Sequence, residues 1–420
     1  MRASSLASRR HLERTAKPGL FDGVARKAVL GRLEQLREGH LVVDDGDRSL
    51  RFGSATPDSL AARVTVRDPR FYTEIAFGGS IGAGEAFMHG FWECDDLVAL
   101  VRILLRNREV LDGMEGGLAR VTAPLQKLFH WLNRNSRVGA RRNIAAHYDL
   151  GNEFFALWLD ATMMYSSAIF AEAGMSLHQA QLHRLDHICR RLDLQPDDRV
   201  IEIGTGWGGF ALHAAQHYGC HVTTTTISRE QHDRAGERIA AAGLEDRVTL
   251  LQDDFRDLGG QYDKLVSIEM IEAVDHALLP VFFRKCDELL APHGAMLVQA
   301  ITMADQRYEE YRKSVDFIRR YIFPGGNLPS NAVMADCAAR ETELRLLGLE
   351  DIGLHYATTL AHWRRNFFER IDAVRAQGYP EEFIRMWDFY LCYCEGAFLE
   401  RAISNVQMLW TKPASRLRTL

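Results

Sequence analysis

Long apolar runs and cysteines are the scarce features of this sequence. No hydrophobic stretch approaches the about 18–20 residues of a membrane-spanning helix. The N-terminal segment is basic, with Arg9 and Arg10 adjacent, but it lacks the apolar core of a secretory signal. The seven cysteines are odd in number and irregularly spaced, which argues against a disulfide framework. We therefore expect reduced thiols and a cytoplasmic protein.

Charge of neither sign dominates the chain of 420 residues. Its 51 lysines and arginines and 56 acidic residues give a net charge of −5, which argues against a general nucleic-acid binder but allows a local basic patch. With 47% hydrophobic residues the chain has the composition of a globular protein, and its length exceeds that of one average domain.

Residues 1–120 predict a small mixed α/β accessory domain. Helical spacing covers residues 25–36, and short strands are expected at 40–43, 49–52 and 62–66. This part contains no catalytic constellation. We expect it to serve in docking, dimerisation or lipid contact, and a homodimer is one possible assembly.

A basic linker is expected at residues 121–146. Within it, residues 127–142 carry five positive charges and no acid, together with Phe129 and Trp131. Such a stretch suits an anionic membrane surface, where each Lys or Arg adds about 1 kcal/mol, and it fits a solvated linker helix equally well. The membrane interpretation predicts peripheral association with the inner face of the membrane.

Strands and helices alternate in the part that follows, which predicts a doubly wound parallel sheet. The rhythm changes after Thr302, and we expect a helical insertion at about 304–348 with a helix at 306–321. The expected strands are 199–203, 221–226, 248–252, 264–268, 295–301, 349–355 and 404–410. The expected helices are 208–217, 228–242, 278–290, 359–376 and 381–400.

An apolar strand that ends in a glycine-rich turn, VIEIGTGWGG at residues 200–209, is the strongest local signal. Glycines let a ligand approach the backbone, and the following helix offers free amides. A dinucleotide site is one interpretation, but no acidic residue closes the next strand, at residues 222–227, to bind a ribose. An S-adenosylmethionine site fits better.

Several separated blocks between His147 and Pro413 resemble the cyclopropane-fatty-acyl-phospholipid synthase family, which includes the mycolic acid cyclopropane synthases. The blocks are HYDLGNEFFALWLDATMMYSSAIF (147–170), IEIGTGWGGFALHAA (201–215), TISREQ (226–231), DDFRDL (253–258), YDKLVSIEMIEAV (262–274), DFIRRYIFPGGNLPS (316–330) and FYLCYCEGAF (389–398). The resemblance implies a Rossmann-like S-adenosylmethionine-dependent methyltransferase sheet in residues 147–420.

The resemblance also implies the residues that bind S-adenosylmethionine. Gln231 takes the ribose role for which no acid is present, and Asp254 with Phe255 forms an adenine-binding pair. The implied set is Tyr165, Ser166, Gly204, Gly206, Thr226, Gln231, Asp254 and Phe255.

The implied reaction transfers a methylene group from S-adenosylmethionine to a cis double bond in an acyl chain of a membrane phospholipid. Family members use a bound bicarbonate ion as the base. Glu272 matches the glutamate that holds this ion, Tyr356 the tyrosine near the reacting centre, and Cys394 the active-site cysteine. Ile301 is expected to present its backbone. Taken without the resemblance, Glu272 is a helix-start acid and Cys394 a small buried hydrophobe.

Three residues depart from the family pattern. Ser167 replaces a common cysteine, Gln299 a common histidine, and Asn327 a further cysteine. We expect the Ser167 hydroxyl and the Gln299 amide to contact the anion. The departures leave open a methylene- or methyl-branched product, and a small-molecule methyltransferase or a non-catalytic lipid-binding protein are the remaining alternatives.

No metal site is expected. Cys392 and Cys394 lie two residues apart on a predicted helix and so point in different directions. The His183–His187 and His213–His217 pairs have helical spacing but no third ligand nearby.

Overall fold

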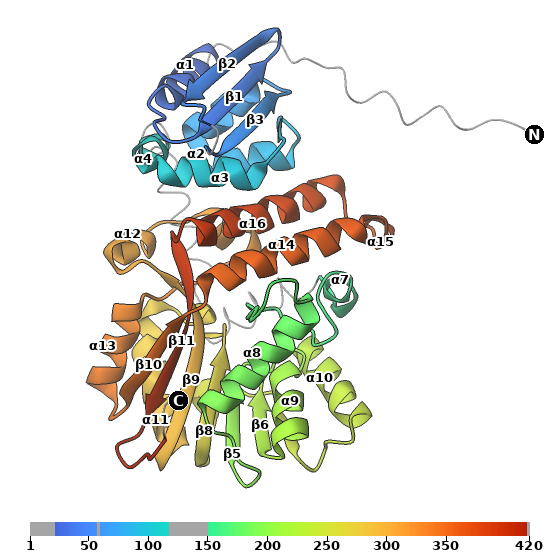
Figure 1. Cartoon of the computed structure of the whole chain (residues 1–420), viewed down its shortest axis with the longest axis vertical. Helices are drawn as coiled ribbons and strands as arrows, with labels where there is room; N and C mark the ends of the chain where they lie inside the picture. The colour runs from blue at the N-terminus through green and yellow to red at the C-terminus, as the bar shows by residue number, and fades with distance from the viewer. Residues whose placement is uncertain (1–21, 57–58, 117–149, 418–420) are drawn as a thin grey trace, which may run out of the picture. The chain divides into compact units, whose positions relative to one another are not determined.

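The computed structural model describes residues 22–56, 59–116 and 150–417 (Figure 1). The chain divides into two compact units, residues 1–125 with 380–389, and residues 126–379 with 390–420. The basic stretch 127–142 lies outside the described residues. None of the helices in the described ranges combines the length and the apolarity that are needed to cross a membrane.

The first unit contains a four-stranded sheet with strand order β2-β1-β3-β4, in which β1 pairs antiparallel with β2 and parallel with β3. β3 begins with alternating exposed and buried residues, whereas the central β1 buries three consecutive residues, 41–43. Its elements are α1 (Asp22–Leu33), β1 (His40–Asp45), β2 (Arg48–Gly53), β3 (Ala61–Val66), α2 (Arg70–Met88), β4 (Trp92–Cys94), α3 (Leu97–Arg106) and α4 (Arg108–Gly116).

Residues 380–389 belong to the first unit although they lie almost 300 residues further along the chain. Arg385 donates hydrogen bonds to the backbone carbonyls of Phe87 and Trp92, the latter at 2.8 Å. Its guanidinium also lies 4.3 Å from the centre of the Phe87 ring, at cation–π distance. The accessory unit is therefore completed by a segment that the sequence assigns to the catalytic part.

The second unit contains a seven-stranded sheet with the order β10-β11-β9-β8-β5-β6-β7. The five strands from β9 to β7 are parallel, whereas β11 pairs antiparallel with both β9 and β10. The strands are β5 (Arg199–Ile203), β6 (His221–Thr225), β7 (Val248–Leu251), β8 (Tyr262–Ile268), β9 (Leu290–Met303), β10 (Arg345–Asp351) and β11 (Ile403–Thr411). This arrangement confirms the predicted methyltransferase sheet.

Helices cover both faces of this sheet (Figure 1). Ile201 and Leu265 point toward α11 and α13, while their neighbours Val200 and Val266 point toward α8, α9 and α10. Successive strand residues face opposite sides, so near-continuous apolar strands build two cores. The helices are α7 (Asn152–Ala156), α8 (Leu177–Arg191), α9 (Gly209–Tyr218), α10 (Arg229–Ala241), α11 (Leu279–Leu289), α12 (Tyr308–Tyr311), α13 (Asn331–Glu341), α14 (Gly353–Glu369), α15 (Ile371–Ala376) and α16 (Glu381–Leu399).

Two predicted elements were wrong. The helix expected at 306–321 is broken into a short 3₁₀ turn, α12 and a π-helical turn at 318–322. The buried Arg319 explains the break, because its guanidinium binds the carbonyls of Tyr311 (3.0 Å) and Ser314 (2.6 Å) that a continuous helix would use itself. The strand expected at 349–355 ends at Asp351, and α14 starts at Gly353.

Candidate active site

The candidate residues gather where the parallel strands end. Gly204 follows β5, Thr226 follows β6, Asp254 lies beyond β7, and Glu269 follows β8. Ligands of open α/β sheets bind outside the carboxyl ends of the strands. The site is therefore built at this edge of the sheet.

The glycine loop has the backbone geometry of a ligand cradle. Gly204 and Gly206 have φ angles of +108° and +53°, which side chains disfavour. The amides of Gly204 and Thr205 both donate to the carbonyl of Thr225, at 3.1 and 3.0 Å, which ties the loop to β6. A Cβ atom added at Gly206 would meet no atom within 4 Å, so the loop borders open space that S-adenosylmethionine fits.

Glu202 supports this loop from beneath. Its Oε2 accepts a hydrogen bond from the Thr224 hydroxyl at 2.6 Å, and the Thr224 and Thr205 hydroxyls lie 2.7 Å apart. Only 1% of Glu202 is exposed, and this desolvation raises the pKa of its carboxyl to about 8. Glu202 is therefore a neutral structural acid at neutral pH.

Thr226 and Gln231 are buried together at the end of β6. The Thr226 hydroxyl donates to Oε1 of Gln231 at 3.0 Å and accepts from the amide of Ser228 at 3.2 Å. Ser228 caps α10, as its position in the sequence predicts, by accepting from the Gln231 amide. These bonds fix the orientation of the side chain that we expect at the ribose.

Asp254 is engaged by a neighbour. Its two carboxylate oxygens accept from Nε (2.7 Å) and Nη2 (2.5 Å) of Arg256 in a bidentate pair. The ring of Phe255 packs edge-on against Phe282, with the ring centres 5.7 Å apart. The predicted adenine pair is thus held in place on a short 3₁₀ turn.

Tyr165 lies in an aromatic cluster. Its ring centre lies 5.3 Å from those of Phe155 and Trp363 and 5.4 Å from that of Trp158. The Tyr165 hydroxyl lies 2.9 Å from the Tyr390 hydroxyl. Aromatic faces attract cations, so this cluster suits a positively charged reaction centre.

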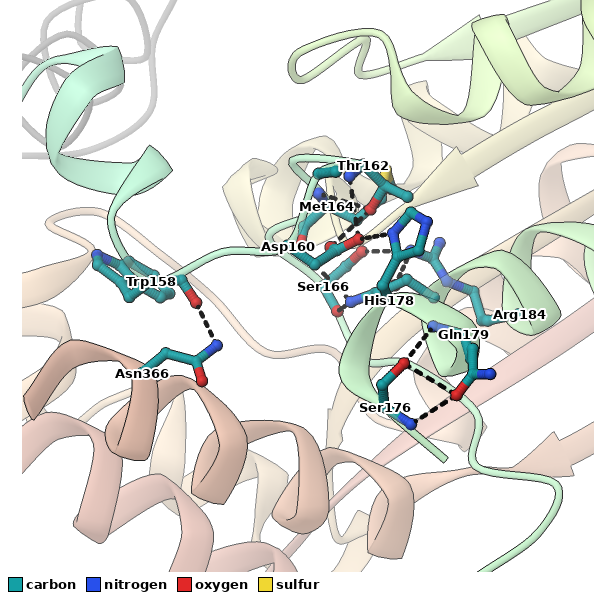
Figure 2. A network of polar contacts seen from close by, with 12 residues as sticks. Trp158, Asp160, Thr162, Met164, Ser166, Ser176, His178, Gln179, Arg184 and Asn366 are labelled. Atoms are coloured by element: carbon teal, nitrogen blue, oxygen red, sulfur yellow. Dashed lines mark hydrogen bonds and ion pairs between the residues drawn. The ribbon is translucent and has the colours of Figure 1, made fainter. Parts of the chain in front are cut away.

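Arg184 is a site residue that the sequence reasoning missed (Figure 2). It is fully buried, and its Nη2 donates to Ser166 Oγ at 3.0 Å and to Gln181 Oε1 at 2.8 Å. Desolvation lowers the pKa of the guanidinium to about 10, while the charges of Glu269 and other acids oppose the shift. Arg184 therefore remains positive. The sequence does contain a sign of this residue, because Arg184 lies on the apolar stripe of α8 with Ala180, Leu185 and Ile188. A charged residue at such a position indicates a buried cation.

Glu269 is the second missed residue, and it forms the polar centre of the site. Its carboxylate accepts four hydrogen bonds from groups that are distant in the sequence. Oε1 accepts from the Ser167 amide (2.9 Å), Gln299 Nε2 (2.8 Å) and Asn405 Nδ2 (2.6 Å), and Oε2 accepts from the Tyr356 hydroxyl (3.0 Å).

The pairing of β9 with β11 assembles the amide donors. Gln299 lies opposite Gln407 and Ile301 opposite Asn405, so these side chains are aligned by the antiparallel register. Gln407 Nε2 donates to Gln299 Oε1 at 3.0 Å, which orients the Gln299 amide toward Glu269. Gln299, Asn405 and Gln407 are fully buried, so their hydrogen bonds are protected from water.

Glu272 lies one turn further along. Its Oε1 accepts the backbone amide of Ile301 at 2.5 Å, and its buried Oε2 has no partner among the residues that the structure describes. Burial, and then the negative charge of Glu269, raise the pKa of Glu272 to about 8. Burial also raises the pKa of Glu269, but its donors and Arg184 oppose that shift. Glu272 therefore holds the proton of the pair at neutral pH.

Tyr356 and Cys394 lie close together. Burial and the charge of Glu269 raise the pKa of Tyr356 well above its usual value, so the phenol stays protonated. Its hydroxyl donates a hydrogen bond to the Glu269 carboxylate. The ring of Tyr356 stacks on Phe398 with the centres 4.5 Å apart. Burial also raises the pKa of the Cys394 thiol above its usual range, which leaves it without thiolate character.

These residues do not fit a bound bicarbonate ion. The Ser167 amide, the Gln299 amide and the Tyr356 hydroxyl all donate to Glu269. The Ser167 hydroxyl donates instead to the Ala168 carbonyl, at 3.0 Å. A second anion here would lie against a carboxylate that already uses the donors, which like-charge repulsion opposes. In the described part of the chain, no group of three metal-ligating side chains forms a metal site either.

Comparisons with known proteins match most of the chain. The family described as mycolic acid cyclopropane synthetase matches residues 135–408. The tuberculostearic acid methyltransferase UfaA1 of Mycobacterium tuberculosis is 38% identical over 409 residues, which cover 92% of this chain and 91% of that protein. The cyclopropane-fatty-acyl-phospholipid synthase of Escherichia coli is 35% identical, covering 86% of this chain and 91% of that protein.

Solved structures agree with the sequence comparison. The cyclopropane synthase MmaA2 from Mycobacterium tuberculosis aligns with a TM-score of 0.60 and 28% identity, covering 65% of this chain and 98% of that one. The mycolic acid cyclopropane synthase CmaA1, solved with SAH and CTAB, aligns with the same TM-score, identity and coverage.

Proposed function

Because the chain belongs to the mycolic acid cyclopropane synthetase family, we propose that it converts a cis double bond in a phospholipid acyl chain into a cyclopropane ring. As a member of this family it is an S-adenosylmethionine-dependent methyltransferase that modifies lipid acyl chains. The proposal adds the acceptor and the product.

The observation that carries the proposal is an aromatic cluster that adjoins a buried carboxylate. The Trp363 ring contacts Tyr165 at 5.3 Å and Tyr356 at 5.8 Å between centres, and Tyr356 binds Glu269. An alkene is a weak nucleophile, and its attack on a sulfonium methyl leaves a carbocation. Such a reaction needs aromatic faces for the cation, one base for the proton, and little water.

A methylene- or methyl-branched acyl product is the second candidate. The 38% identity to a protein named as a tuberculostearic acid methyltransferase supports it, as does Gln299 in place of the common histidine. The one-carbon unit and the lipid class are the same in both candidates. They differ in the carbon that loses the proton.

Mass spectrometry of lipids from bacteria that express the protein tests both candidates. We expect a gain of one CH₂ in each modified unsaturated chain, and the fragment ions distinguish a ring from a branch. Gly206→Asn is the matched inactive variant, since asparagine tolerates the left-handed backbone while its side chain enters the open space beside the loop. Unmodified lipids with the wild-type protein, together with methylation of a small polar acceptor, would contradict the proposal.

We also propose peripheral attachment to an anionic membrane through the basic stretch at residues 127–142. Binding to anionic vesicles should weaken with salt, because exposed charges are screened over about 10 Å at 0.1 M ionic strength. Equal binding to neutral and anionic vesicles would contradict this role.

A further inference from the structure

We infer that Glu269 is the general base of the reaction, a carboxylate of the chain itself that takes the place of a bound anion. This inference rests on the proposed function, because it assigns the group that removes the proton after methyl transfer.

The hydrogen bonds specify an ionised carboxylate with one open side. A neutral carboxyl group would have to place a proton on one oxygen, whereas all four partners of Glu269 are N–H or O–H donors. From the described part of the chain, Oε1 receives three donors and Oε2 receives one, the Tyr356 hydroxyl. Oε2 therefore keeps a lone pair for a proton.

The backbone at Glu269 is strained, and this conformation directs the carboxylate toward its four donors. Its φ of +49° is left-handed, a conformation that is unfavourable for a non-glycine residue. The Glu269 amide donates to the Gln299 carbonyl at 2.8 Å, which holds the turn after β8 against β9. Glycine would adopt this backbone conformation without strain. We therefore attribute the presence of a glutamate at position 269 to a role of its carboxylate.

The neighbouring charged groups also favour an ionised Glu269. Arg184 is buried and positive on one side, and it favours the anionic form of Glu269. Within the described ranges, Glu272 Oε2 has no hydrogen-bond partner, its Oε1 accepts from the Ile301 amide, and the charge of Glu269 raises its pKa. One negative charge is therefore shared by two glutamates, and the four donors place it on Glu269.

The step balances without a further reactant. An alkene carbon bonds to the methyl group as the methyl–sulfur bond breaks, and the sulfur keeps that electron pair as S-adenosylhomocysteine leaves. The neighbouring chain carbon becomes positive. Oε2 of Glu269 then takes a proton from the former methyl group, and the released C–H electron pair closes the ring. The protonated Glu269 finally gives its proton to water.

The test uses the full-length enzyme, vesicles of a cis-monounsaturated phospholipid, and S-adenosylmethionine. Wild-type turnover should be the same in argon-purged buffer and in buffer with added bicarbonate. Glu269→Gln removes the base but keeps the size, so kcat should fall about 10²–10⁴-fold. The affinity for S-adenosylmethionine, measured by calorimetry, should stay within twofold of the wild type.

Glu269→Gly provides the second variant, since it suits the backbone and leaves the four donors without an acceptor. Added formate or bicarbonate should restore part of its lost turnover. Glu237→Gln, on the exposed surface of α10, is the matched control and should behave as wild type.

Two results would overturn the role of Glu269: wild-type turnover that is lost without bicarbonate, or a Glu269→Gln enzyme that keeps its turnover. If Glu269→Gln does not fold, the bicarbonate dependence of the wild type still decides. If the wild-type enzyme releases S-adenosylhomocysteine in the presence of the vesicles but modifies no lipid, the proposed function itself is contradicted.

Discussion

Glu202→Gln should remove part of the pH dependence of stability. Burial raises the pKa of Glu202 from 4.5 to about 8 in the folded protein. The folded chain therefore keeps a proton that the unfolded chain releases in this range. Its stabilising effect is complete below about pH 4.5 and is lost as the pH rises through 8. The free energy of unfolding falls by up to about 1.4 kcal/mol per pH unit in this window.

The size of the effect follows from these two values. Between pH 6 and pH 8, Glu202 alone should lower the free energy of unfolding by about 2 kcal/mol. Glu272, whose pKa is also raised to about 8, adds a similar amount. Glutamine has nearly the same shape, and its carbonyl still accepts the Thr224 hydroxyl, but it does not titrate. Other groups, such as His213 with its lowered pKa, also change the slope, so the effect of Glu202 is the difference between the two proteins. Between pH 6 and pH 8 the free energy of unfolding of the variant should fall by about 2 kcal/mol less than that of the wild type.

Urea unfolding, followed by tryptophan fluorescence at several pH values from 5 to 8.5, measures this slope. Glu237→Gln, which changes an exposed glutamate, should follow the wild type at each pH. A Glu202→Gln protein with the full wild-type slope would refute the assignment of a neutral buried acid. A free energy of unfolding that falls more steeply with pH in Glu202→Gln than in the wild type would refute the direction of the Glu202 pKa shift.

Three further changes probe the surroundings of the site. Arg184→Met removes the cation that favours ionised Glu269, so the acid limb of kcat/KM against pH should move to higher pH. Tyr356→Phe leaves Oε2 of Glu269 without its donor, which costs about 1–3 kcal/mol and should lower kcat about tenfold or more with unchanged cofactor affinity in calorimetry. Trp363→Ala empties a fully buried site and should cost about 3–5 kcal/mol in urea unfolding, unlike Phe368→Ala at the surface.

Strong periodicity explains why most of the fold was predictable. The strands β5 to β9 alternate with helical segments, and β5 to β8 were placed to within two residues, whereas β9 begins at Leu290 rather than at residue 295. The prediction failed where a tertiary contact overrides local spacing. Residues 306–321 have helical spacing, but the buried Arg319 takes the carbonyls of two broken turns, and no local pattern encodes that contact.

The candidate site was predictable only in part. The glycine loop can be recognised in the sequence, because four closely spaced glycines follow an apolar strand. Glu269 cannot be recognised in this way, since a glutamate that follows a strand is often an ordinary surface residue. A usable signal was polar residues alternating inside otherwise apolar strands, with Gln299 in β9 and Asn405 and Gln407 in β11. Such amides are buried only with partners: Gln299 and Asn405 both donate to the missing acid, and Gln407 donates to Gln299.

The donors of Glu269 show why no short motif contains this site. Ser167, Gln299, Tyr356 and Asn405 span most of the catalytic unit, so the buried charge becomes favourable only after β11 has paired with β9. Until then the left-handed backbone and the desolvated carboxylate both oppose folding. The base is thus stabilised by long-range contacts. For the same reason a change such as histidine to Gln299 is tolerated, because Gln407 holds the new amide in the orientation that Glu269 needs.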